Sequence, residues 1–369
     1  MELSKIAQNL GGSVIRQMFN EALKMTDTIS FTVGEPDFVT PRPIIDEACL
    51  KWQAGLTHYT HNAGVIELRR EIAKYEERLS PDPETQIIVT CGATEAIQMA
   101  LFSVVNPGDE VILVTPAWPN YFGQIGMCGA VLKAVPAYEE NNFVPDVADI
   151  RNAITEKTKA VILNSPSNPT GAVIDRDTMT KLAELFREHD LFVIADEVYN
   201  RLTYGDEAYT SLTSFEGLEE KVIYINGFSK MFAMTGWRLG YAISRPEIIK
   251  SMTKLHENGA SCLPAPSQLA AALALRSCQD EIEKMRTIYE KRRDLMCGLM
   301  NQISGVSCRV PKGAFYVFAN IQETGLSSED FCMRLLRKTG VVTVPGSGFG
   351  EVGKGYVRFT YATSEANIS

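Results

Sequence analysis

Five short, mostly apolar runs between residues 87 and 225 constrain the fold more than any other feature of the chain. They are Ile87–Thr90, Val111–Val114, Ala160–Leu163, Leu191–Ala195 and Val222–Ile225. Because these runs do not alternate with polar residues, strands formed by them must be buried on both faces. Helical spacing appears between two of the runs, at Met179, Leu182, Ala183 and Phe186. The pattern predicts an α/β fold in which a mostly parallel sheet is flanked by helices.

The length of 369 residues exceeds what a single core usually supports, so two domains are expected. Residues 281–300 are charged and contain no helix breaker before Gly298, which predicts a helix that leads out of the large domain. Beyond it, Ala314–Phe318 and Tyr356–Thr360 predict strands of a smaller α+β domain. We expect three parts: an N-terminal segment that packs with the small domain (1–40), a large domain (41–285) and a small C-terminal domain (286–369).

Charge and composition exclude several classes of function. A net charge of −9 disfavours nucleic acid or an anionic membrane as the main partner. No apolar run is long enough to span a bilayer, and Met1–Lys5 lacks the apolar region that follows in a signal peptide. The eight cysteines form no C-x-x-C pair and the four histidines lack metal-ligand spacing, so no metal site is predicted. We expect a cytoplasmic protein with reduced thiols.

Ligands of open α/β sheets bind at the carboxyl ends of the strands, so polar residues after each run are candidates. Lys230 follows Val222–Ile225 in a tight polar turn, which suits an amine that attacks a carbonyl. A surface lysine is the alternative. Asp196 ends another run, where a buried carboxylate needs a cationic partner; a helix N-cap is the other interpretation. Gly92, Ala93 and Thr94 open a helix, which predicts an anion site.

Three further residues stand out by their surroundings. Asn168 lies in a turn that two prolines and a terminal glycine make rigid, NSPSNPTG. Trp118 follows a strand end, where an aromatic ring either stacks on a flat ligand or belongs to the core. Arg358 has apolar neighbours in the second domain. Such an arginine either binds a ligand carboxylate through two hydrogen bonds or forms a structural ion pair.

Together these motifs resemble those of the class I/II pyridoxal-phosphate-dependent aminotransferases of fold type I, the aspartate aminotransferase superfamily. The matching strings are GEPDF from Gly34, NSPSNPTG from Asn164, DEVY from Asp196 and SKMFAMTGWRLGY from Ser229. They occur in family order and span about residues 32 to 361. Two positions depart from the family pattern: Ser165 precedes Pro166, and Gly227 stands where many relatives carry serine.

The resemblance implies a seven-stranded, mostly parallel sheet in a large pyridoxal 5'-phosphate-binding domain, and a smaller α+β domain. It implies a homodimer with active sites at the interface and a place in amino acid metabolism and biosynthesis. The family has a closing helix after its last strand, whereas this sequence stops at Ser369, soon after Tyr356–Thr360. We therefore expect the small domain to lack part of that helix. Catalysis would rest on Lys230, which forms the Schiff base and moves the α-proton, on Asp196 at the pyridine nitrogen and on Tyr199 at the phenolic oxygen.

The remaining implied contacts are of two kinds. Cofactor contacts would come from Gly92, Ala93, Thr94, Trp118, Asn168, Ser229 and Arg238, and from Tyr59, which reaches the phosphate in the neighbouring subunit. Substrate contacts would come from Gly34, Asn168 and Arg358.

The implied reaction moves an amino group from an L-amino acid to a 2-oxo acid. Aspartate, aromatic and other neutral amino acids are the candidate substrates. Some aspartate-specific members carry a lysine where this chain has Thr94, which weakens a dedicated aspartate activity. Two alternatives stay open: a C–S β-lyase on the same fold, and a non-catalytic cofactor-binding regulator.

Overall fold

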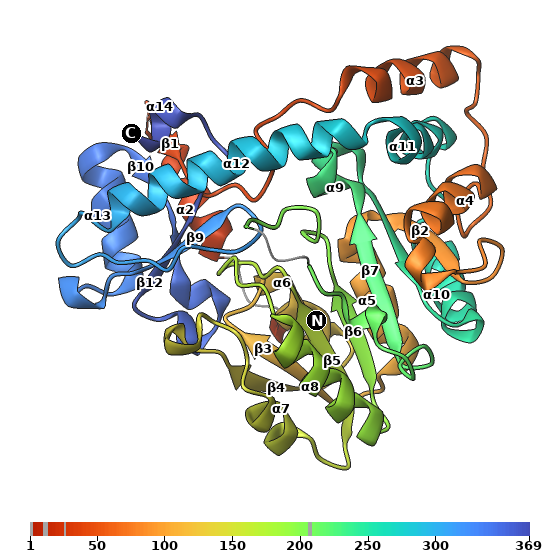
Figure 1. The fold of residues 1–369 in the computed structure, drawn as a ribbon, viewed down its shortest axis with the longest axis horizontal. Coiled ribbons are helices and arrows are strands. Elements are labelled where there is room, and N and C mark those ends of the chain that lie inside the picture. The colour runs from red at the N-terminus through yellow and green to blue at the C-terminus, as the bar shows by residue number, and fades with distance from the viewer. Residues whose placement is uncertain (1–2, 10–13, 26, 206–208) are drawn as a thin grey trace.

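The computed structural model describes residues 3–9, 14–25, 27–205 and 209–369. Part of the predicted N-terminal segment, namely residues 1–2, 10–13 and 26, therefore lies outside the described residues, and so do residues 206–208 of the predicted large domain. Figure 1 shows a large sheet to the right and a smaller sheet to the left, with a long helix running between them.

A seven-stranded sheet forms the larger part, in the order β2-β8-β7-β6-β5-β3-β4. Its strands are β2 (Ile87–Cys91), β3 (Glu110–Thr115), β4 (Val131–Pro136), β5 (Thr158–Asn164), β6 (Phe192–Asp196), β7 (Val222–Gly227) and β8 (Leu239–Ile243). β8 runs opposite to the other six strands and is antiparallel to both of its neighbours, β2 and β7. The mostly parallel sheet predicted from the apolar runs is confirmed, and all five runs are strands.

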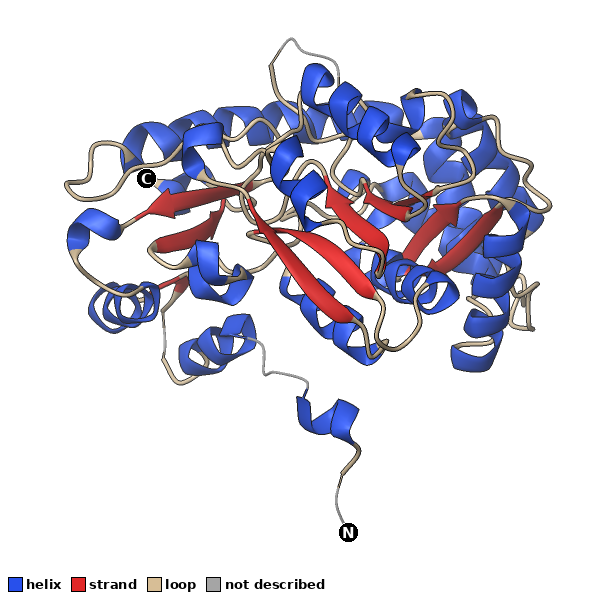
Figure 2. Cartoon of the chain, turned by 90° about the horizontal axis from the view of Figure 1, so that it is seen from below, coloured by secondary structure: helices blue, strands red, loops and turns tan. Residues whose placement is uncertain are grey.

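Helices cover both faces of this sheet, as Figure 2 shows. One face carries α3 (Arg42–Gln53), α4 (Ile66–Tyr75), α8 (Arg176–Glu188) and α11 (Ala265–Ser277); the other carries α5 (Gly92–Val104), α6 (Pro119–Met127) and α10 (Pro246–Gly259). Successive residues such as Val193 and Ile194 enter opposite cores, both fully buried. Each such side chain contributes about 1.5–3 kcal/mol, which is why apolar runs without alternation fold as interior strands.

The smaller part is built on an antiparallel sheet in the order β11-β12-β9, formed by Val344–Pro345, Tyr356–Thr360 and Tyr316–Asn320. Helices α13 (Ser328–Thr339) and α14 (Glu365–Ile368) belong to the same region. From the N-terminal segment, β1 (Ile29–Ser30) pairs in parallel with β10 (Val341–Val342), and α2 (Val14–Ala22) precedes it. The limits of the three predicted parts stay a prediction.

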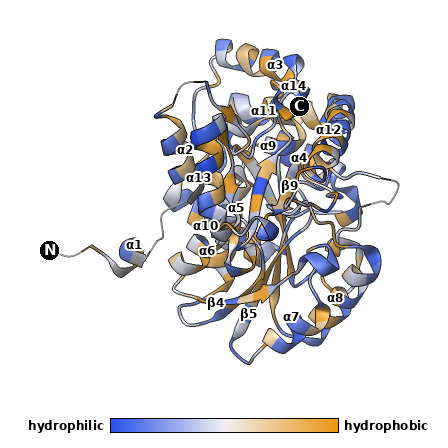
Figure 3. Ribbon diagram, turned by 90° about the vertical axis from the view of Figure 1, so that its left-hand side faces the viewer, coloured by the Kyte–Doolittle hydropathy of each residue, from blue (hydrophilic) through white to orange (hydrophobic). Residues whose placement is uncertain are grey.

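Hydropathy follows this layering. Figure 3 shows hydrophilic residues over the outward faces of helices such as α8, and hydrophobic residues along the strands inside. None of the helices in the described ranges combines the length and apolar character that a membrane crossing requires.

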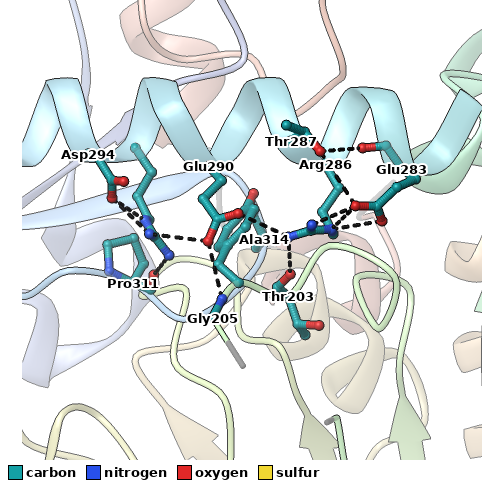
Figure 4. A network of polar contacts seen from close by, with 11 residues as sticks. Thr203, Gly205, Glu283, Arg286, Thr287, Glu290, Asp294, Pro311 and Ala314 are labelled. Carbon is teal, nitrogen blue, oxygen red and sulfur yellow. Dashed lines mark hydrogen bonds and ion pairs between the residues drawn. The ribbon is translucent and has the colours of Figure 1, made fainter. Parts of the chain in front are cut away.

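Helix α12 (Gln279–Met300) connects the two parts and contains the helix predicted over residues 281–300. Its polar side chains hold loops of both parts, as Figure 4 shows. Arg286 Nη1 donates to the Thr203 carbonyl at 3.4 Å, and Glu290 Oε1 accepts from the Gly205 N–H at 3.2 Å. Arg293 Nη1 donates to the Pro311 carbonyl at 3.3 Å. These bonds keep the carboxyl edge of the large sheet next to the small sheet.

Candidate active site

A cavity of about 560 Å³ opens where the carboxyl ends of β5, β6 and β7 face the small sheet. Eleven of the residues predicted from the sequence line it together: Gly34, Ala93, Thr94, Trp118, Asn168, Asp196, Tyr199, Ser229, Lys230, Arg238 and Arg358. Its size is that of an ordinary small-molecule site.

Lys230 lies in the one-turn helix α9 (Phe228–Met231), which follows directly after β7. Its Nζ donates a hydrogen bond to the Gly34 carbonyl and lies 5.9 Å from the centre of the Tyr199 ring. Desolvation lowers the pKa of Lys230 from 10.5 to about 8; Arg358 and Arg238 act in the same direction, against Glu35 and Asp196. A large share of this amine is therefore unprotonated near pH 8, as a nucleophile requires.

Asp196 ends β6 and is only 3% exposed. Tyr121 Oη donates to its Oδ2 at 2.5 Å, and the Val198 N–H donates to Oδ1 at 3.3 Å. Desolvation raises the pKa of Asp196 from 3.8 to about 6, although the Tyr121 hydrogen bond opposes the shift. Residues 197–200 form a turn rather than a helix, so the N-cap interpretation of Asp196 is wrong. A buried carboxylate in this position fits a ligand that carries positive charge.

The amino end of α5 and the side chain of Arg238 form one surface. Gly92 has a φ of +73°, and a Cβ there would lie 2.6 Å from Arg238 Nη2. A Cβ at Gly240 would lie 2.4 Å from the Ala93 nitrogen. The first N–H groups of a helix have no acceptor within the helix, and the helix dipole is positive at that end. With a permanently charged guanidinium beside them, these groups fit a phosphate.

Arg358, on β12, is 2% exposed and points into the same cavity. Its Nη1 donates to Asn168 Oδ1 at 3.0 Å and its Nη2 to the Thr32 carbonyl at 2.5 Å, while its Nε has no hydrogen-bond partner. Burial lowers the pKa of Arg358. No carboxylate of the described residues pairs with it, so the structural ion pair considered as an alternative is absent there. An unbalanced buried cation fits an anionic ligand.

Of the lining residues that were not predicted from the sequence, four bear on the chemistry of the site. Tyr316 Oη hydrogen-bonds Tyr199 Oη at 2.8 Å, and Arg358 Cζ lies 4.6 Å from the centre of the Tyr316 ring. Asn164 donates to the Asp196 carbonyl at 3.0 Å and accepts from the Asn168 N–H at 3.0 Å. The others are Tyr121, on Asp196, and Glu35, which accepts from Thr235 Oγ1 at 2.8 Å. Asn164 and Glu35 stand inside recognisable strings; Tyr121 and Tyr316 carry no such signal.

Of the predicted residues, Gly34 lies very close to the Tyr316 side chain, and Tyr59 lies outside the cavity. A Cβ at Gly34 would lie 2.6 Å from Tyr316 Oη, so glycine lets this backbone approach the cavity closely. Tyr59 is 91% exposed and lines a separate recess with Trp52 and Cys262. Its predicted contact, with the phosphate of a neighbouring subunit, stays a prediction. Among the described residues, no three His, Cys, Asp or Glu side chains gather as a metal site requires.

Comparison with known proteins agrees with this geometry. The family model described as aminotransferase class I and II matches residues 26–369. The chain is 42% identical to an aspartate aminotransferase of Pyrococcus abyssi, over 99% of this chain and 95% of that one. It is 40% identical to an aromatic-amino-acid aminotransferase of Thermococcus litoralis, with the same shares of the two chains covered.

A solved structure gives the same result for the fold. The aspartate aminotransferase from Thermus thermophilus with maleate superposes with a TM-score of 0.93 at 35% identity, and the match covers 100% of this chain and 97% of that one. The fold type I architecture expected from the motifs is thereby confirmed. The chain belongs to the class I and II aminotransferases, a pyridoxal-phosphate-dependent family, and is an enzyme that transfers amino groups.

Proposed function

We propose that this chain holds pyridoxal 5'-phosphate in the cavity around Lys230 and uses it to move an amino group from an L-amino acid to a 2-oxo acid. One observation carries the proposal: the amine of Lys230, whose pKa is lowered to about 8, shares a cavity with the buried Asp196 carboxylate and two arginines, Arg238 and Arg358. When bound, the cofactor supplies an aldehyde that condenses with amines and a ring that accepts electrons from the substrate's α-carbon.

Each group of the chain has a defined part in this proposal. Gly92, Ala93, Thr94, Ser229 and Arg238 would hold the phosphate, and Trp118 would cover the ring. Asp196 would keep the ring nitrogen protonated, because its carboxylate is otherwise buried without a cationic partner. Tyr199 and Asn168 would bind the phenolic oxygen. Lys230 Nζ would remove the proton from the substrate's α-carbon, since a pKa lowered to about 8 leaves part of the amine unprotonated near neutral pH.

The lining supports neutral or aromatic side chains over acidic ones. Besides Lys230, the cations of the described lining are Arg238 and Arg358, and both have a proposed anion already. Thr94 is uncharged, and Glu35 adds a negative charge to the same wall. Trp118, Tyr121 and Tyr316 present aromatic surface. We therefore propose aromatic or other neutral L-amino acids as preferred donors and aspartate as a weaker one.

The cofactor-loaded enzyme tests this directly when it is mixed with single L-amino acids. We expect phenylalanine to change the cofactor's visible absorption and to yield its 2-oxo acid without free ammonia, faster than aspartate does. Release of pyruvate and ammonia from sulfur amino acids would identify a C–S β-lyase instead. An unchanged spectrum with every amino acid would contradict any transfer activity. If aspartate is faster, the substrate preference is wrong while the reaction stands.

Replacing Arg358 with glutamine should raise KM far more than it lowers kcat. Arg358 is proposed to grip the α-carboxylate, and the loss of a charge-assisted bidentate bond costs about 2–3 kcal/mol, or on the order of 100-fold in affinity. Steady-state kinetics with both substrates measure the split. Arg309→Gln, an exposed arginine of the same part of the chain, is the control and should leave KM unchanged. An unchanged KM in Arg358→Gln would contradict the assignment.

A homodimer in the cytoplasm completes the proposal. Trp52 and Tyr59 expose aromatic surface beside the recess that also includes Leu263 and Pro264. Aromatic surface of this kind is typical of protein interfaces. A second copy that covers it would bring Tyr59 toward a neighbouring site, which the single chain does not do.

A further inference from the structure

A buried polar network lies behind the cavity, on the face of the sheet that carries α4. Glu76 follows the last residue of α4, is 2% exposed and accepts two tyrosine hydroxyls on one oxygen. Tyr224 Oη donates to its Oε1 at 2.7 Å, and Tyr241 Oη donates to the same atom at 2.8 Å. Arg78 Nη2 lies 3.2 Å from its other oxygen. None of these side chains reaches the cavity lining.

The two tyrosines differ in what else they touch. Tyr224 Oη also accepts hydrogen bonds from Asn226 Nδ2 at 2.8 Å and from Asn200 Nδ2 at 3.2 Å. Of the described polar contacts, Tyr241 Oη has only the one to Glu76. Burial, and next the Glu76 carboxylate, raise the pKa of both hydroxyls well above the usual value. Both therefore stay protonated donors throughout the working pH range.

The two asparagines belong to the two segments that contain Lys230 and Asp196. Asn226 Oδ1 accepts the N–H of Gly227 at 2.8 Å, at the junction between β7 and the Lys230 helix. Asn200 follows Tyr199 in the turn after Asp196, and its N–H donates to the Glu197 carbonyl at 2.9 Å. The Tyr224 hydroxyl thus links two segments: the end of β7 with α9, called here the Lys230 loop (residues 226–231), and the turn that contains Asp196 and Tyr199.

We propose that the Tyr224 hydroxyl, anchored by Glu76, is a positioning group that fixes the Lys230 loop relative to the Asp196–Tyr199 turn. The inference rests on the proposed function only in treating Lys230 as the reacting amine. Without the hydroxyl, Asn226 and Asn200 lose a shared acceptor, and the Lys230 loop can move away from the wall of the cavity. A displacement of about 1 Å is enough to cost up to 100-fold in rate.

The Lys230 amine itself reports on such a movement. The charged groups that face it are Glu35, Asp196, Arg238 and Arg358, and desolvation is the largest cause of its lowered pKa. A loop that relaxes admits water, so the pKa rises from about 8 toward its ordinary value of 10.5. A network that only stabilises the fold would lower the melting temperature and leave this pKa unchanged.

The experiment compares Tyr224→Phe with Tyr241→Phe in the full chain without cofactor. Both remove one buried hydroxyl from the same Glu76 oxygen, but only the first disconnects the asparagines. Acetylation of Lys230 by acetic anhydride, measured by mass spectrometry across pH, gives its pKa. We expect a rise of about one unit or more for Tyr224→Phe, no shift for Tyr241→Phe, and about a tenfold lower kcat in the loaded Tyr224→Phe enzyme alone.

Asn226→Ala is the second variant, for the case in which Tyr224→Phe does not fold. It leaves both tyrosines and Glu76 in place and removes the link to Gly227, so it should raise the Lys230 pKa as well. Equal pKa values in wild type and in a folded Tyr224→Phe or Asn226→Ala protein would overturn the proposal, and so would an equal shift in Tyr241→Phe. Because the labelling needs neither substrate nor cofactor, its outcome is independent of whether Lys230 carries the reaction.

Discussion

Replacing Lys230 with alanine is expected to abolish transamination and to leave the fold intact. The variant lacks the only side-chain amine in the described lining, and with it both the nucleophile and the base at the α-carbon. We expect kcat to fall by about 10⁴-fold or more, because a positioned acid–base group alone contributes 10²–10⁴-fold. Steady-state kinetics on the cofactor-loaded protein measure the loss. Residual transamination within tenfold of wild type would refute the assignment of Lys230.

The stability of the Lys230→Ala chain distinguishes the loss of a catalytic amine from misfolding of the variant. The folded pKa of about 8 lies below the ordinary lysine pKa of 10.5, so the native cofactor-free chain binds fewer protons than the unfolded chain between these pH values. Lys230 therefore costs stability in full below pH 8, and the cost disappears as pH rises to about 10.5. The Lys230→Ala chain avoids this cost, up to about 3 kcal/mol at pH 7, which offsets the packing it loses. Lys254→Ala, an exposed lysine of α10, is the control and should keep both activity and melting temperature.

The sheet could be predicted from the sequence because a strand that is buried on both faces consists of consecutive apolar residues. Val111–Val114 and Leu191–Ala195 consist of apolar residues and belong to interior strands of the sheet, which have a hydrophobic core on each face. β4 was missed for the opposite reason. It is the edge strand, and Val131 and Leu132 are exposed, so Val131–Pro136 carries no pattern of burial.

The candidate site could be predicted where its residues stand in short strings at strand ends, as Asp196 and Lys230 do. It could not be predicted where the decisive contact joins distant parts of the chain. Tyr316 has apolar neighbours in a strand, and its hydrogen-bond partner Tyr199 is 117 residues away in sequence. Tyr224 likewise looks like one more core residue of β7 until Glu76, 148 residues away, is brought against it. Local patterns report burial and turns, whereas such pairings depend on how the elements pack.

Replacing Asp196 with asparagine is expected to lower kcat and to stabilise the cofactor-free chain at the same time. Asparagine keeps one oxygen, which can accept from the Val198 N–H, while its amide nitrogen replaces the oxygen beside Tyr121 and can donate to that hydroxyl; the side chain carries no charge. The ring nitrogen of the cofactor then lacks its anionic partner, and the loss of one such electrostatic contact costs about 10²–10³-fold in kcat. Glu197→Gln is the matched control: the neighbouring carboxylate is equally buried but bonds Ser211 instead, so its replacement should leave kcat within about threefold of wild type.

The gain in stability follows from the direction of the pKa shift. The folded pKa of about 6 lies above the ordinary aspartate pKa of 3.8, so ionised Asp196 costs stability, fully above pH 6 and not at all below about pH 4. At pH 7.5 the cofactor-free Asp196→Asn chain should therefore be more stable by on the order of 1–3 kcal/mol, and the difference should vanish as the pH is lowered to 4. Thermal unfolding across pH, beside steady-state kinetics, measures both. A variant that loses activity and also melts at a lower temperature at pH 7.5 would mean that Asp196 serves the fold. A variant that loses activity but melts at a higher temperature would mean that the chain keeps a destabilising charge for its chemistry.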